Sequence, residues 1–219
     1  MSLKIDMMET AKVLILFHAF CGGVALIAGS LSMLFKKGAK PHKKSGITFY
    51  YAMVVCGLTA LIVSCLPQHK SPFLFSVGIF SLYFVLSGKS SLRFKHESPN
   101  LFFDKLLSII MIVTGVLMIF LPVLMNKSIN VILLVFAVTG ISFSVRDLII
   151  FNNAEKLKKG WLKLHLGKMM GGYISAATAF VVVNNVFPSY TGWFIPGIIG
   201  GFVIAYWMRK VTTQNVQSP

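Results

Sequence analysis

The sequence predicts an all-α protein, a polytopic integral membrane bundle of about seven transmembrane helices that forms a single transmembrane domain over residues 1–219. Of its 219 residues, 56% are hydrophobic and only 12% are charged, and the mean hydropathy is +0.78. A soluble domain carries about 25% charged residues, so this chain has too few charges to cover its apolar groups in water. The apolar residues form runs of about 20, the length that crosses a bilayer as a helix. The runs are continuous and not alternating, which favours helices over barrel strands.

Helix-breaking residues separate the apolar runs along the chain. The seven predicted membrane helices cover residues 12–35, 46–66, 72–92, 105–125, 128–151, 162–187 and 191–208. The connections contain Gly38 with Pro41, Pro67 with Pro72, and then single prolines at 99 and 188. The end of the third segment, KSSLRFKHESPN, is the least regular of these boundaries.

The lysines and arginines predict how the chain crosses the membrane. The net charge is +15, and most of the basic residues fall in alternate short connections: five in 36–45, four in 88–105, five in 146–163 and two after the last helix. Cytoplasmic loops are enriched in lysine and arginine, so this pattern predicts an outside N-terminus and a cytoplasmic C-terminus in a bacterial cytoplasmic membrane. The basic charge is therefore a topology signal, with the lipid bilayer as partner and no nucleic acid.

Several classes of enzyme lack support in the sequence. It contains no HExxH, no Walker loop, no GxSxG and no pair of carboxylates within one predicted helix. The acidic residues near the membrane are so few that an intramembrane carboxylate relay is not expected. Whether the chain is an enzyme stays open on these grounds.

His18 is the first ionisable residue predicted at membrane depth. Together with Gly22, Ala25 and Gly29 it forms a stripe of small residues along one helix face. One interpretation is that another helix packs closely on this stripe and accepts a hydrogen bond from His18. The other is that the smooth face admits a flat macrocycle, with the imidazole as its axial ligand.

A polar cluster is predicted at the cytoplasmic ends of the helices. Arg146 and Asp147 close the fifth segment, and we expect Asp147 to pair with Arg146 or with a lysine close to water, or else to orient the ring of His165. His42, His165 and Lys168 lie at a similar depth. Such a cluster suits a metal ion, a haem or an anionic headgroup, with His42 and His165 as the candidate metal ligands, or it contacts only lipid phosphates and loop carbonyls.

A faint internal repeat accompanies these two histidines. His42 is followed by Gly46 and Tyr50, and His165 is followed at the same spacings by Met169 and Tyr173. Spacings of four and eight place each set on one helix face, which adds Tyr173 to the candidate cluster. Two short matches are also what chance produces.

Three stretches carry a resemblance to a known family: HAFCGGVALIAGS, KPHKKSGITFYYAM and WLKLHLGKMMGGYISAATAF. They resemble a family of uncharacterised bacterial multi-pass proteins, a domain of unknown function described as a predicted membrane protein, over nearly the whole chain. The positions that match its signature are His18, His42, Trp161, His165 and Tyr173. The resemblance implies a seven-helix integral membrane domain and no established activity.

Three functions remain open from the sequence. The first is a haem b or metal-binding redox protein, with His42 and His165 as an inner axial pair. The second is a small-solute carrier, because glycine-rich helices with Pro122 and Pro196 can bend. The third is a scaffold without chemistry. In each case the Gly-x3-Gly faces at 167–171 and 197–201 suit helix packing or a homo-oligomer.

Overall fold

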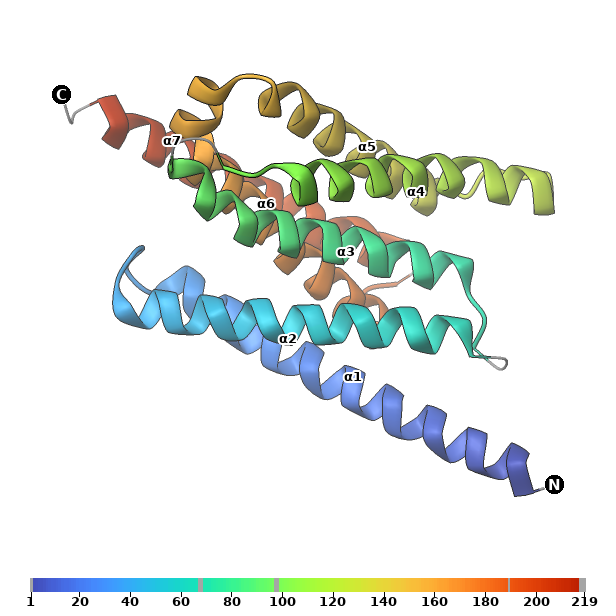
Figure 1. The fold of residues 1–219 in the computed structure, drawn as a ribbon. Coiled ribbons are helices and arrows are strands. Elements are labelled where there is room, and N and C mark those ends of the chain that lie inside the picture. Colours follow the sequence, from blue (N-terminus) through green and yellow to red (C-terminus); the bar gives the residue numbers. More distant parts are fainter. Residues whose placement is uncertain (1, 67–68, 97–98, 189, 217–219) are drawn as a thin grey trace. The chain divides into compact units, whose positions relative to one another are not determined.

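The fold is known from a computed structural model, which describes residues 2–66, 69–96, 99–188 and 190–216. All regular secondary structure in these ranges is helical (Figure 1). The helices are α1 (Ser2–Leu34), α2 (Lys40–Cys65), α3 (Pro72–Ser90), the 3-10 helix η1 (Ser91–Lys95), α4 (Phe102–Asn126), α5 (Val131–Phe151), α6 (Ala154–Val183) and α7 (Thr191–Val216). The seven α-helices are each long and apolar enough to cross a membrane, which confirms the predicted fold class.

Several helices extend beyond the apolar runs that predicted them. The second helix begins at Lys40, where Pro41 fits the first turn, and the sixth begins at Ala154, eight residues before its predicted start. The side chain of Asn153 caps α6 by accepting a hydrogen bond from the Lys156 amide at 2.9 Å. Apolar runs mark the part of a helix that lies in lipid, whereas capping residues mark where the helix itself begins.

The chain divides into two compact units, residues 1–82 and 83–219. In the first unit α1 packs on α2, and the predicted small-residue stripe of α1 lies in this contact. His18 Nδ1 lies 3.0 Å from the Cys56 carbonyl oxygen and 3.1 Å from Thr59 Oγ1, and Ala25 is fully buried. These contacts support the helix-packing interpretation of the stripe.

In the second unit the last turns of α3 pack closely on α6, and α4 packs on α5. Glycines permit the approach of α3 and α6. A Cβ atom built at Gly171 would lie 2.5 Å from the ring of Phe84, and one built at Gly172 would lie 2.6 Å from Val85 Cγ2. Because these two glycines carry no side chain, the stretch of α6 that contains Lys168 can lie directly against α3.

Candidate functional site

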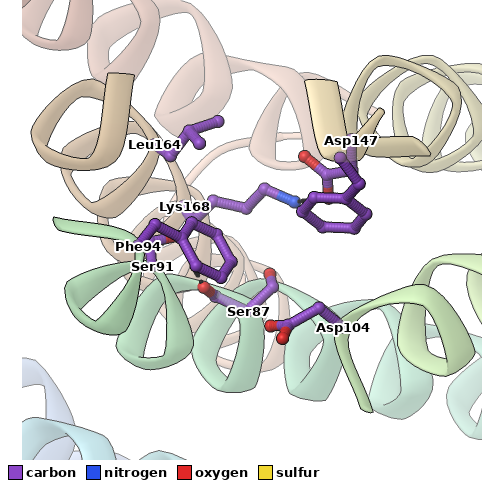
Figure 2. Close-up of a pocket in the computed structure, with 8 residues that line it drawn as sticks. Ser87, Ser91, Phe94, Asp104, Asp147, Leu164 and Lys168 are labelled. Carbon is purple, nitrogen blue, oxygen red and sulfur yellow. Dashed lines mark hydrogen bonds and ion pairs between the residues drawn. The ribbon is translucent and has the colours of Figure 1, made fainter. Parts of the chain in front are cut away.

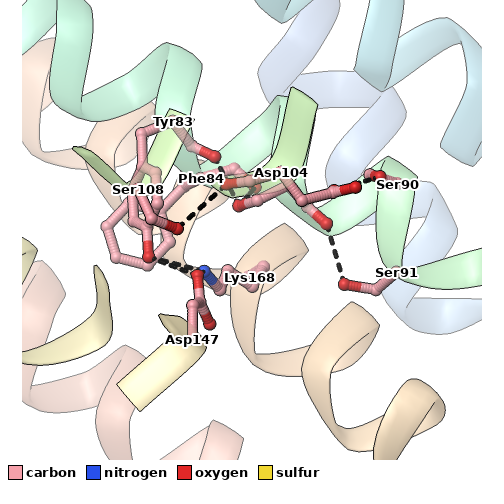
Figure 3. A network of polar contacts seen from close by, with 9 residues as sticks. Tyr83, Phe84, Ser90, Ser91, Asp104, Ser108, Asp147 and Lys168 are labelled. Atoms are coloured by element: carbon pink, nitrogen blue, oxygen red, sulfur yellow. Dashed lines mark hydrogen bonds and ion pairs between the residues drawn. The ribbon is translucent and has the colours of Figure 1, made fainter. Parts of the chain in front are cut away.

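A buried ion pair joins α5 and α6 in the second unit. Lys168 and Asp147 are each only 3% exposed, and the Lys168 ammonium donates to Asp147 Oδ2 (Figure 3). Tyr83 of α3 completes a three-residue contact: its hydroxyl donates to the same Asp147 oxygen at 2.7 Å and accepts from Lys168 Nζ at 2.6 Å. The ammonium also lies 4.1 Å from the centre of the Tyr83 ring. Three helices therefore meet at one charged contact.

Local packing on α3 places Lys168 in this position. A Cβ atom built at Gly88 would lie 3.0 Å from the Met169 amide nitrogen and 3.1 Å from Lys168 Cβ. The backbones of α3 and α6 can approach this closely only because Gly88 has no side chain. The Lys168 side chain is consequently held in the protein interior, where it cannot extend to the membrane surface as lysines near helix ends do.

A second carboxylate is buried beside the first. Asp104, in the first turn of α4, is 1% exposed and accepts hydrogen bonds from the Ser90 hydroxyl and from Arg93. Arg93, half exposed on η1, lies 2.9 Å from Asp104 Oδ2 and 2.7 Å from Ser90 Oγ. Arg93 of η1 thus balances the charge of Asp104, while Lys168 of α6 balances the charge of Asp147.

A narrow pocket connects the two carboxylates (Figure 2). We call it the charge pocket, and its polar lining consists of Ser87, Ser91, Asp104, Asp147 and Lys168. Phe94, Phe151 and Leu164 supply the apolar lining, and the first two belong to a buried cluster in which their ring centroids are 5.8 Å apart. In this conformation the pocket is too narrow to admit a water molecule.

Ser144 adds an unusual polar group next to the ion pair. It lies three residues before Asp147 on α5, is completely buried, and is close enough to the Tyr83 hydroxyl to interact with it electrostatically. Its hydroxyl is the one buried side-chain N or O atom without a hydrogen-bond partner in the described ranges. Leaving such a group without a partner costs about 1–3 kcal/mol, so its presence needs a reason.

The membrane-depth histidines bond to backbone carbonyls. His165 Nδ1 lies 2.7 Å from the Gly88 carbonyl oxygen, and His42 Nδ1 lies 2.9 Å from that of Ser32. A carbonyl only accepts, so Nδ1 carries the hydrogen in both rings. Gly88 and Ser32 lie in the last turns of α3 and α1, whose carbonyls lack helical partners. The two halves of the faint repeat thus make the same contact with the end of a neighbouring helix.

The predicted cytoplasmic cluster is realised in part. Asp147 pairs with Lys168, as the lysine alternative predicted, and it is 3% exposed, so other protein groups surround its carboxylate. The alternative role, orienting the ring of His165, is taken by the Gly88 carbonyl. Arg146 is exposed on α5 beside the pair.

The other members of the cluster lie outside the ion pair. His165 is one helical turn before Lys168 on α6 and does not line the charge pocket. Tyr173 is half-buried further along α6, also outside the pocket lining. His42 belongs to the first unit, whereas the ion pair belongs to the second. The histidines and the buried charges are therefore separate features of the chain.

Sequence reasoning missed Asp104 and Tyr83, and with them the second carboxylate. Asp104 directly precedes the predicted start of the fourth segment at residue 105, so the sequence prediction assigns it to the preceding loop. Two of the six acidic residues, Asp104 and Asp147, are buried in this unit. An aspartate directly before a long apolar run is also typical of a helix N-terminus, and this pattern could have placed Asp104 in the first turn of the fourth helix.

Metal ligands do not gather at this site or elsewhere in the part of the chain that the structure describes. No group of three His, Cys, Asp or Glu residues there is placed to hold a metal ion. No family model, curated protein or solved structure matches the chain.

Proposed function

We propose that this multi-pass membrane protein is a carrier of a small solute and that the charge pocket is its binding site. The observation that carries the proposal is the ion pair of Lys168 and Asp147, buried among α3, α5 and α6 within segments able to span a membrane. Ionisable residues inside membrane helices are rare, and they mark substrate, ion or proton pathways. Pro122 in α4 and Pro196 in α7 provide places where helices can bend between two states.

The energetics argue against a purely structural role for the pair. Removing a lysine and an aspartate from water costs several kcal/mol for each ion, and apolar residues of similar volume often stabilise a protein as well or better. Apolar residues in place of the two charges would give a scaffold the same packing without the desolvation cost. A binding site has a use for the charges, because a solute can replace one partner of the pair.

Solute binding provides the first test. We expect at least one of five probes, namely pyruvate, inorganic phosphate, ammonium, glycine and glucose, to raise the melting temperature of the detergent-purified protein. A ligand at a hundredfold excess over its dissociation constant stabilises by about 2.7 kcal/mol. The double variant K168M/D147L, which removes both charges together, should fold and lose this response. If no probe stabilises the wild-type protein, or if the double variant responds equally, the charge pocket is not the binding site.

We further propose that the chain lies in a bacterial cytoplasmic membrane with its N-terminus outside and its C-terminus in the cytoplasm. The support is the concentration of basic residues in alternate connections. Alkaline phosphatase fused after Pro219 should be inactive in intact cells, and green fluorescent protein fused there should fluoresce. Active phosphatase at this position would reverse the assignment.

A second candidate function, haem b binding, is favoured by the hydrogen bonds of the histidines. Donation from Nδ1 to a backbone carbonyl leaves the neutral ring with its lone pair on Nε2, which is the arrangement of metal-bound histidines. This candidate predicts a sharp Soret band in the spectrum of detergent-purified protein, lost in His165→Ala. A colourless preparation that contains no metal eliminates it.

We propose that a homo-oligomer, if formed, uses α7. A Cβ atom at Gly197 or Gly201 would meet no atom within 4 Å, whereas Gly167 and Gly171 face Met208 and Phe84 inside the chain. The α7 pair is therefore the Gly-x3-Gly face left for a neighbouring helix.

A further inference from the structure

We infer that the solute of the charge pocket is a small monocarboxylate, carried together with one proton that Asp147 accepts; this inference rests on the proposed carrier function. Lys168 is the only cation that belongs to the buried triad with Asp147 and Tyr83. The neighbouring carboxylate, Asp104, is already held by Arg93 and Ser90. An anion that enters the pocket can therefore gain a buried cation only by taking the place of Asp147 at Lys168.

Charge balance links this exchange to a proton. An anion beside ionised Asp147 would give two negative charges against one ammonium in a medium of low dielectric, which is strongly unfavourable. A proton on the Asp147 carboxylate removes one negative charge, so that the ammonium pairs with the anion. The site then has the same net charge as before, and no covalent bond to the solute forms or breaks.

Hydrogen-bond donors are already placed for such an anion. Lys168 Nζ and the Tyr83 hydroxyl converge on one carboxylate oxygen of Asp147. A substrate carboxylate in this place would receive the same two donors. The Ser144 hydroxyl, which makes no hydrogen bond that meets the geometric criteria, lies one turn before Asp147 on α5 and is available to a second oxygen. The unpartnered hydroxyl thus has a role in the loaded state.

Charged and titratable groups surround the pair on all four helices. Tyr83 faces it from α3, Asp104 from α4, Arg146 from α5, and His165 lies a turn away on α6. Arg146 and the basic residues of η1 and the start of α6 place positive charge at the pocket's end of the helices, which raises the local concentration of anions. Asp147 is the carboxylate in direct contact with Lys168, so it is the group that must take the proton.

The residues that line the pocket indicate which type of anion would suit it. Phe94, Phe151 and Leu164 provide an apolar wall, while the hydroxyls of Ser87 and Ser91 provide a polar one. A carboxylate with a short tail of two or three carbons matches this mixture. Because the pocket admits no water in the present conformation, a larger or multiply charged anion would require a much greater opening.

Uptake of radiolabelled pyruvate into proteoliposomes tests the inference. We expect wild-type protein to drive uptake when the outside is more acidic than the lumen, with an entrapped pH dye reporting proton entry at one proton per pyruvate. A protonophore should abolish accumulation, and a potassium diffusion potential set with valinomycin should leave the rate unchanged because the loaded site carries no extra charge. Inorganic phosphate and glucose serve as comparison solutes.

Two variants test separately the anion-binding role of Lys168 and the proton-accepting role of Asp147. Lys168→Met should lower uptake by about tenfold or more, whereas Lys163→Met, at an exposed lysine on the same helix, should not change it. Asp147→Asn should retain exchange of pyruvate for pyruvate and lose the response to the pH gradient. The comparison of pH gradient with membrane potential needs only the wild-type protein, so it decides the coupling even where a variant fails to fold.

The outcomes separate this inference from the proposed function. Pyruvate uptake that follows the membrane potential overturns the proton coupling. Stabilisation of the wild-type protein by ammonium, glycine or glucose alone, without pyruvate uptake, overturns the monocarboxylate assignment and leaves the carrier standing. A protein that responds to none of the five probes and transports none of them overturns both.

Discussion

Replacing Asp147 with leucine is expected to destabilise the protein by about 3–5 kcal/mol, because it leaves the buried ammonium of Lys168 without its counter-charge. Lys168 is 3% exposed and has no route to the membrane surface in this packing. Tyr83 alone then remains to hold the ammonium through its hydroxyl and ring. Thermal or denaturant-induced unfolding in detergent micelles, followed by circular dichroism, measures the change.

The double variant K168M/D147L is the matched control for this prediction. Replacing both ions with apolar residues removes the desolvation cost of each, so its stability should return to that of the wild-type protein or exceed it by about 1–4 kcal/mol. A double variant as unstable as Asp147→Leu would show that the pair holds the helices together. The proposal that the charges are retained for binding would then lose its energetic support.

Substituting alanine for Gly171 is expected to cost about 1–3 kcal/mol, because the added methyl group would lie 2.5 Å from the ring of Phe84 and must push α3 away from α6. The same displacement would separate Tyr83 from Lys168, so solute binding should weaken together with stability. Melting temperature and the thermal response to the stabilising probe are the two measurements.

Gly201→Ala is the control for the Gly171 variant, since it makes the same substitution in the other Gly-x3-Gly pair. A Cβ atom at Gly201 meets no atom within 4 Å, so the melting temperature should stay the same or rise. Equal losses for the two variants would mean that the close approach of α3 and α6 is not what Gly171 provides.

The transmembrane helices could be predicted from the sequence because the signal, a run of about 20 apolar residues, lies within each helix. The helix ends were less predictable. The sixth helix continues back to its cap at Asn153 through a lysine-rich stretch that carries no apolar signal. Lysine has a good helix propensity, so the polar turns stay helical where the chain leaves the membrane.

Individual residues of the candidate site could be predicted from the sequence, but the contacts between them could not. Lys168 stood out as a cation within an apolar segment, and Asp147 as an acid near the end of another. Their pairing depends on the rotation and depth of α5 and α6, and the Tyr83 contact joins residues 85 positions apart in the sequence. No spacing rule within one helix reports such a contact, so the sequence pattern alone favours the histidines, whose ligand chemistry is visible residue by residue.

The length of α6 has an electrical consequence. Its 30 residues span about 45 Å, against a hydrocarbon core of about 30 Å. Lys168 lies seven residues, or about 10 Å, beyond Trp161, where the lysine-rich turns give way to apolar ones, and about 22 Å before Val183. Most of a transmembrane voltage would therefore fall between the ion pair and the Val183 end of α6. A lone charge moving along that stretch would be subject to most of the 2.3 kcal/mol that each 100 mV imposes, and a proton travelling with its anion would be subject to none of it.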